Sequence, residues 1–168
     1  MAQASEAFVG FGGNLGDPYR AIHQAAQELR AMPGIEAVTL SSCFRTAPVQ
    51  ASGPDFCNAV AHVRTRLTPA QLLDALLAVE HAHGRTRDHW HAPRTLDLDL
   101  LAHGDTRIIG SQLTIPHPRA HERAFVLVPL CELNDRVLLG PPESATLMPA
   151  RHWHGLLSAQ SLSDIRPW

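Results

Sequence analysis

The stretch "PRTLDLDLL", residues 93–101, decides how the rest of this chain is interpreted. A strand over Leu96–Leu101 alternates its side chains between two faces, so its leucines point into a core. Asp97 and Asp99 then lie side by side on the other face. Two like charges on one strand face destabilise it unless a positive charge lies between them. Taken alone, the pattern favours a solvated strand face, and the residues around it shift the interpretation to a strand that holds a shared cation or a pair of cations.

The composition is that of one globular domain. The chain has 168 residues, of which 45% are hydrophobic, enough for a real core. Its net charge of -2 argues against a broad nucleic-acid surface. It has no apolar run of about 18 residues and no secretory signal, and its three separated cysteines fit free thiols in a reducing compartment. We therefore expect a single cytoplasmic domain over residues 1–168, a monomer whose partners include neither a nucleic acid nor a membrane.

The hydrophobic periodicity predicts the order strand–helix–strand–strand–helix–strand. Strands are expected at residues 7–12, 35–44, 56–67 and 96–101. One helix follows Asp17, a good N-cap, and the next follows Thr68, which forms a capping box with Gln71. The short connection between the second and third strands favours an antiparallel pair. This order is the split βαβ pattern of a ferredoxin-like α+β sandwich, an antiparallel sheet with helices packed on it.

The segment "GFGGNLGD", residues 10–17, joins the first strand to the first helix. Its glycines allow a positive φ and a close approach of another group to the backbone. The segment lacks the dinucleotide-binding pattern. A nucleotide-phosphate loop and a tight turn beside a binding site remain equally open.

Basic residues surround the Asp pair in the sequence: Arg85, Arg87, Arg94 and Arg123. Arginine binds phosphate oxygens in a bidentate manner, and carboxylates hold Mg²⁺ through oxygen, so the mixture suggests a polyphosphate bridged by metal. Surface salt bridges between these groups are the plain alternative. A zinc site formed by His89, His91 and the Asp pair is a further alternative. His117 lies between two prolines and could donate a hydrogen bond to phosphate.

Five segments, in order, carry a resemblance to a known family: "GGNLGD" at 12–17, "SSCFRTAPV" at 41–49, "DFCNAV" at 55–60, "APRTLDLDLL" at 92–101 and "LTIPHPRAHERAFVLVPL" at 113–130. They resemble 6-hydroxymethyl-7,8-dihydropterin pyrophosphokinase, an enzyme of folate biosynthesis. The resemblance covers about residues 7–134, and the tail 135–168 carries none of it. It implies that the two terminal phosphates of ATP are transferred to the pterin hydroxymethyl group, with release of AMP. A non-catalytic pterin- or nucleotide-binding paralogue and a metal-dependent phosphohydrolase are the alternatives.

The resemblance also implies cofactors and site residues. ATP is the co-substrate, and Asp97 and Asp99 hold two Mg²⁺ ions. The catalytic residues it implies are Arg85, Arg94, Asp97 and Asp99. The nucleotide-binding residues are Glu80, Arg85, Arg87, Arg94, Thr114, His117 and Arg123. The pterin-binding residues are Thr46, Pro48, Val49, Phe56, Asn58, Trp90 and Phe125, with His91 as an alternative to Trp90 for covering the pterin.

The chain departs from the family pattern at a few positions that bear on nucleotide affinity and on the closure of the site. Ala47 precedes Pro48 where the family usually has two prolines, Gln112 stands where a basic residue is common, and Pro118 replaces an aromatic residue. The polar segment 85–94 is expected to be a lid that becomes ordered when nucleotide binds.

Overall fold

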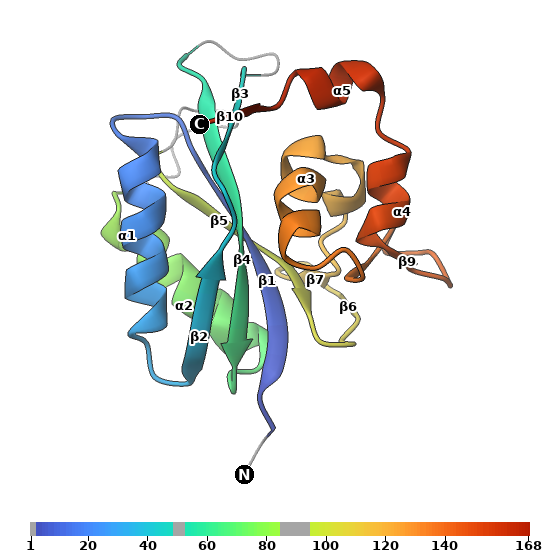
Figure 1. The fold of residues 1–168 in the computed structure, drawn as a ribbon. Coiled ribbons are helices and arrows are strands. Elements are labelled where there is room, and N and C mark those ends of the chain that lie inside the picture. The colour runs from blue at the N-terminus through green and yellow to red at the C-terminus, as the bar shows by residue number, and fades with distance from the viewer. Residues whose placement is uncertain (1–2, 49–52, 85–94) are drawn as a thin grey trace.

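An antiparallel sheet forms the centre of the computed structural model, which describes residues 3–48, 53–84 and 95–168. Its strands are β1 (Ser5–Gly13), β2 (Ile35–Leu40), β3 (Phe44–Thr46), β4 (Phe56–Thr65), β5 (Asp97–His103) and β10 (Arg166–Pro167). The strand order is β10-β3-β4-β1-β5, and β2 pairs with β4 on the same side as β3 but further along β4 (Figure 1). All of these pairings are antiparallel, as the short connection between the second and third predicted strands indicated.

Two helices cover one face of the sheet: α1 (Pro18–Arg30) and α2 (Pro69–Ala82) (Figure 1). The side chain of Asp17 caps α1 by accepting from the backbone N–H of Arg20, and Thr68 forms the predicted capping box with Gln71. Buried side chains of both helices pack against alternate residues of the strands to form a first core. The predicted ferredoxin-like α+β sandwich is confirmed by this arrangement.

A second helical layer covers the other face of the sheet. It consists of α3 (Ala124–Leu133) and α4 (Ala150–Gly155) (Figure 1). Phe8 on β1, Val60 on β4 and Leu101 on β5 belong to a second buried core together with residues of both helices. The central strands are therefore buried on both faces over part of their length.

Short elements link these layers: β6 (Ile108–Ile109), β7 (Thr114–Ile115), the 3₁₀ helix η1 (Ala120–Glu122), β8 (Leu138–Leu139), β9 (Met148–Pro149) and α5 (Ala159–Ser163). β6 pairs with β7, and β8 pairs with β9. After β7 the backbone N–H of His117 donates to the carbonyl of Leu101 over 2.8 Å, which docks this loop on β5. Among the described residues, no helix is both long and apolar enough to span a bilayer.

The expected strand over residues 35–44 is split, and that part of the prediction was wrong. β2 ends at Leu40 and β3 begins at Phe44. Between them the Ser41 hydroxyl accepts from the backbone N–H of Val60 over 2.9 Å, which replaces a regular ladder bond with a side-chain bond. Ser42 is bonded instead to the carboxylate of Glu132 on α3, through its N–H and its hydroxyl. The break therefore depends on a partner ninety positions further along the chain.

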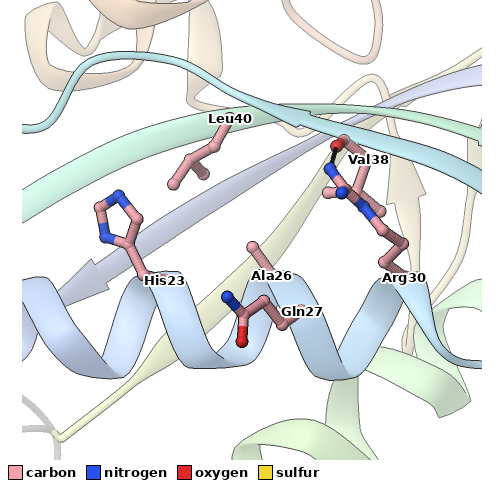
Figure 2. A pocket seen from close by; sticks show the side chains of 6 residues that line it. All are labelled: His23, Ala26, Gln27, Arg30, Val38 and Leu40. Atoms are coloured by element: carbon pink, nitrogen blue, oxygen red, sulfur yellow. Dashed lines mark hydrogen bonds between the residues drawn. The ribbon is translucent and has the colours of Figure 1, made fainter.

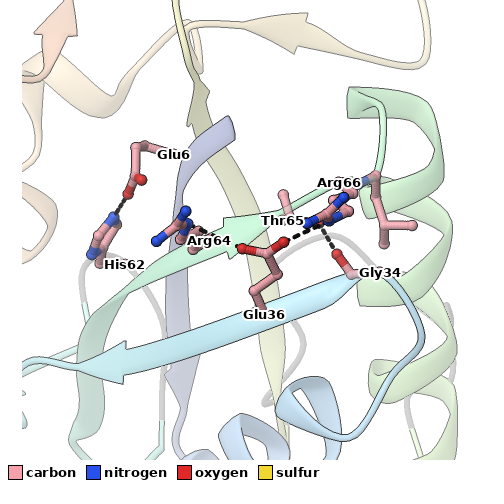
Figure 3. Close-up of polar contacts among 8 residues, drawn as sticks. Glu6, Gly34, Glu36, His62, Arg64, Thr65 and Arg66 are labelled. Carbon is pink, nitrogen blue, oxygen red and sulfur yellow. Dashed lines mark hydrogen bonds and ion pairs between the residues drawn. The ribbon is translucent and has the colours of Figure 1, made fainter. Parts of the chain in front are cut away.

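Two polar surface features lie away from the Asp pair. Glu36 on β2 forms ion pairs with Arg64 and Arg66, near the end of β1 opposite to Gly12 (Figure 3). Exposed ion pairs of this kind contribute about 0–1 kcal/mol each to stability. A groove of about 180 Å³ lies between α1 and β2, where Arg30 donates to the carbonyl of Val38 (Figure 2). Both features belong to the framework of the fold.

Candidate active site

The two aspartates lie on β5 with the alternation that the sequence predicts. Leu98 and Leu100 are buried in the first core, whereas Asp97 and Asp99 are half-buried on the opposite face. The neighbouring residues on β1 are Gly12, which pairs with Asp97, and Gly10, which pairs with Asp99. Because α1 and α2 cover the leucine face, both carboxylates project from the face that carries α3.

Gly10 and Gly12 leave the sheet bare beside the aspartates. A Cβ on Gly10 would lie 3.6 Å from Cδ2 of Leu101 and 3.9 Å from the Cβ of Asp99, and a Cβ on Gly12 would lie 3.4 Å from Oδ1 of Asn58. Gly12 therefore separates Asn58 on β4 from Asp97 on β5, a span of two strand spacings, or about 10 Å. Of the two alternatives for this glycine-rich segment, the structure favours the tight turn beside a site, since Gly12 belongs to β1 and Gly16 has a φ of 64° in the turn. Sequence reasoning did not single out Gly10.

Three residues predicted to bind pterin lie together on β3 and β4. Asn58 is buried and its side-chain amide donates to the Thr46 hydroxyl over 2.8 Å. Phe56 is the cross-strand partner of Thr46, and Pro48 follows β3 by two residues. The amide oxygen of Asn58 faces Gly12. An amide with a defined donor and a defined acceptor is thus held on β4 beside the bare strip of backbone on β1.

Cationic and neutral donors from the loop before α3 lie within electrostatic reach of the aspartates. Burial lowers the pKa of the Arg123 guanidinium, while Asp99 and Asp97 both favour its charged form. Its guanidinium also lies 5.6 Å from the ring centroid of Phe125, in the first turn of α3. Arg123, Phe125 and the Asp pair therefore share one region of the molecule.

His117 is neutral at pH 7. The pKa of its imidazole is lowered to about 4, chiefly by burial and in smaller part by Arg123 and Arg119, while Asp97 opposes the shift. Its Nδ1 accepts from the backbone N–H of Arg119 over 3.1 Å, which leaves the ring proton on Nε2. A neutral imidazole with a donor at Nε2 can bind a phosphate oxygen without a charge of its own. Arg119 is a further basic group here that sequence reasoning missed, although it stands next to "PHP".

Two other residues of the predicted nucleotide set have described partners. Glu80 on α2 is buried, and its carboxylate accepts from the backbone N–H of Leu98 over 2.6 Å. Leu98 is the residue between the two aspartates in the sequence. The hydroxyl of Thr114 on β7 donates to the carbonyl of Gly110 over 3.2 Å. Their roles toward nucleotide stay predictions.

Several predicted residues lie outside the described part of the chain: Val49, Arg85, Arg87, Trp90 and Arg94. The same holds for the expected lid at 85–94 and for His89 and His91 of the zinc alternative.

A magnesium ion suits the aspartates. Among residues 3–48, 53–84 and 95–168, no three His, Cys, Asp or Glu side chains gather as a metal-binding group. Mg²⁺ commonly takes one or two carboxylates and completes its shell with water and substrate phosphate oxygens, so two half-buried aspartates on one strand face fit it.

Comparison with known proteins shows the family to which this chain belongs. Residues 8–135 match the family model of 7,8-dihydro-6-hydroxymethylpterin-pyrophosphokinase (HPPK). The chain belongs to this family. A 2-amino-4-hydroxy-6-hydroxymethyldihydropteridine pyrophosphokinase of Synechocystis is 43% identical over 131 residues, which are 78% of this chain and 67% of that protein. The enzyme of the same name from Methylorubrum extorquens is 39% identical over 137 residues, 81% of this chain and 87% of that protein.

Solved structures support the HPPK fold independently. A crystal structure of an HPPK-DHPS in complex with substrates has a TM-score of 0.68 at 13% identity, and covers 92% of this chain and 43% of that one. A Plasmodium falciparum HPPK-DHPS triple mutant with pteroate has a TM-score of 0.71 at 11% identity, and covers 98% and 47%. This chain spans less than half the length of those proteins, and the likeness concerns the fold alone.

Proposed function

We propose that this HPPK-family protein transfers the two terminal phosphates of ATP to the hydroxymethyl group of 6-hydroxymethyl-7,8-dihydropterin, in folate biosynthesis, and releases AMP. The observation that carries the proposal is the strip of bare backbone on β1. Across this strip, the Asn58–Thr46 pair lies on the β4 side of Gly12, and the two aspartates lie on the β5 side of Gly12 and Gly10. A flat heterocycle and a metal-bound polyphosphate can thus lie side by side on one sheet face.

The reaction needs no protein nucleophile. The hydroxyl oxygen of the pterin forms a bond to the β-phosphorus of ATP, and the bond from that phosphorus to the oxygen bridging to the α-phosphate breaks. AMP leaves with the bridging oxygen, and the hydroxyl proton is lost. Mg²⁺, when bound, neutralises phosphate charge and aligns the attacking and leaving oxygens. Asp97 and Asp99 hold the metal in this proposal, which assigns two ions to them.

Residues of this chain contact the nucleotide at several points in the proposal. Arg123 supplies a positive charge that the aspartates keep in its ionised form, and His117 donates from Nε2. Both groups suit phosphate oxygens, the first by charge and the second by a directed hydrogen bond. The remaining members of the proposed nucleotide set are Glu80, Arg85, Arg87, Arg94 and Thr114. The proposal counts Arg85 and Arg94 as catalytic residues together with Asp97 and Asp99.

Asn58 and the aromatic residues hold the pterin. The ring system has an amide-like edge, which a fixed side-chain amide can match with one donor and one acceptor. Phe56 and Phe125 offer ring faces to a flat heterocycle. The proposed pterin pocket is completed by Thr46, Pro48, Val49 and Trp90.

The proposal includes a cytoplasmic monomer that folds as one domain over residues 1–168 and acts on ATP and the pterin as its small-molecule partners. The three cysteines are all free thiols, which suits a reducing compartment.

The products of the reaction test the proposal. Purified protein with MgATP and 6-hydroxymethyl-7,8-dihydropterin is expected to release AMP and not ADP. Phosphate released without pterin would instead indicate a phosphohydrolase. Binding of ATP and pterin without AMP would indicate a non-catalytic paralogue, and either result contradicts the proposal.

A further inference from the structure

The strand that carries Thr46 is very short, and the last residues of the chain cover its outer side. β3 has three residues, with β4 on one side and β10 on the other. Arg166 pairs with Arg45, and Pro167 pairs with Phe44. The backbone N–H of Trp168 extends this pairing by donating to the carbonyl of Cys43 over 3.0 Å. Figure 1 shows the chain passing from α5 into β10 beside β3.

Side chains reinforce this pairing on one face of the sheet. The guanidinium carbon of Arg45 lies 4.2 Å from the ring centroid of Trp168, which is a cation–π contact. The same guanidinium lies 3.8 Å from the carboxylate of Asp55, just before β4. All three side chains line one hollow of about 460 Å³ next to the N-terminal turn of α1. We call Arg45, Asp55 and Trp168 the Trp168 clamp.

The clamp and the pterin residues lie on opposite faces of the same strand. Side chains alternate along β3, so Arg45 points to the α1 side while Phe44 and Thr46 point to the other. Thr46 is the acceptor for the amide of Asn58. A shift of β3 along β4 would move this hydroxyl away from Asn58. The clamp therefore fixes the position of the Thr46 hydroxyl relative to Asn58 through the backbone of β3.

We propose that the Trp168 clamp positions β3, and thereby the Thr46–Asn58 pair, for binding of the pterin. The inference rests on the proposed function, since it assigns the pterin to that pair. Trp168 and Arg45 are positioning residues. Thr46 and Asn58 contact the end of the pterin that does not react. A displaced pair therefore weakens binding of the pterin equally in the ground state and in the transition state. We therefore expect a change in the KM for pterin and no change in kcat. The KM for ATP should also keep its value, because the proposed ATP site lies on β5, on the other side of β1.

The decisive variant is Trp168→Ala, with Leu156→Ala as its matched control. Leu156 is an exposed apolar residue of the same tail. Loss of an exposed cation–π contact predicts a rise of about two- to fivefold in the KM for pterin. Isothermal titration of the full chain with the pterin and a non-hydrolysable ATP analogue measures binding without turnover. It should show the same loss for pterin, with unchanged affinity for the analogue.

A conservative variant separates positioning from general destabilisation. Trp168→Phe keeps an aromatic face for Arg45 and is expected to restore most of the pterin affinity. Arg45→Gln, which keeps a polar side chain but removes the guanidinium and its charge, should reproduce the loss and replaces Trp168→Ala if that variant fails to fold. Each variant is also compared with the wild type by its melting temperature.

The outcomes distinguish the clamp from the proposed function. An unchanged pterin affinity in Trp168→Ala, or equal losses for pterin and ATP, overturns the clamp while AMP release by the wild type still stands. Weaker pterin binding in the variant, with no AMP from the wild type, supports the clamp and overturns the reaction.

Discussion

At the scale of single residues, the carboxylates of Asp97 and Asp99 lie on the same strand face and repel each other. They project from one face of β5, two positions apart, with backbone glycines beside them. Such a pair destabilises a strand in the absence of a cation, and this suits a metal site better than a structural role.

Asp97→Asn is expected to lower AMP release by about a thousandfold, because metal-ion stabilisation of the transition state amounts to several kcal/mol. The melting temperature without Mg²⁺ should change little, since the variant loses the repulsion from Asp99 and also the attraction to Arg123. Turnover assays and thermal unfolding measure the two effects. Asp105→Asn, in the exposed turn after β5, is the control and should leave both unchanged. Turnover close to the wild-type rate in Asp97→Asn would remove this aspartate from the metal site.

His117 makes a pH-dependent contribution to stability. Its folded-state pKa is lowered from 6.5 to about 4, chiefly by burial, so the unfolded chain binds a proton at this residue that the folded chain does not between those values. The stabilisation is complete above pH 6.5 and is lost as the pH falls toward 4. Between pH 7 and 5, the wild type should therefore lose about 1–2 kcal/mol more stability than His117→Gln.

Urea unfolding of both proteins at the two pH values measures this difference. The other histidines contribute equally to wild type and variant, so they cancel in the comparison. Equal losses in the two proteins would show that His117 titrates near its ordinary value in the folded state.

At the scale of elements, Glu80 ties α2 to the strand that bears the aspartates. Its carboxylate accepts the N–H of Leu98, and both residues are buried. Glu80→Ala leaves this N–H without its acceptor, which predicts a loss of about 1–3 kcal/mol in the free energy of unfolding. Asp74→Ala, exposed on the same helix, is the control and should change stability little. Urea denaturation gives both values, and similar results for the two variants would show that the Glu80 bond is not important for stability.

Elements defined by local chemistry were predictable from the sequence. The Leu-Asp alternation placed β5 and the direction of its side chains, and Thr68 with Gln71 marked the start of α2. Asn58 and Thr46 came from the family resemblance, and their hydrogen bond is visible only once β3 and β4 are paired.

Features that depend on distant partners were not predictable. The break after Leu40 needs Glu132 on α3, and the strand beyond β3 needs residues 166–168 at the other end of the chain. The second helical layer did leave a signal, in apolar runs such as Leu100-Leu101-Ala102. A strand buried on one face alternates, whereas one buried on both faces is continuously apolar.

At the scale of the whole molecule, the tail beyond the family match completes the fold. The family model ends at residue 135, yet Val137, Leu139 and Ala150 are buried in the second core beside Phe8 and Leu127. These residues seal the sheet face that also carries the Asp pair. Without the tail, apolar side chains of β1, β4 and α3 would be left in water, at about 25 cal/mol per Å² of newly exposed apolar surface.

We therefore expect residues 1–168 to unfold in one cooperative step, and tryptophan fluorescence can test this because Trp153 and Trp168 both lie in the tail. Trp90→Phe removes the third tryptophan, so that the fluorescence of the variant reports the tail alone. Far-UV circular dichroism reports the sheet and the long helices. In urea the two signals should give the same midpoint and the same slope, as a two-state transition requires. A fluorescence midpoint at a clearly lower urea concentration would show instead that the tail unfolds first, and that residues 8–135 stay folded without it.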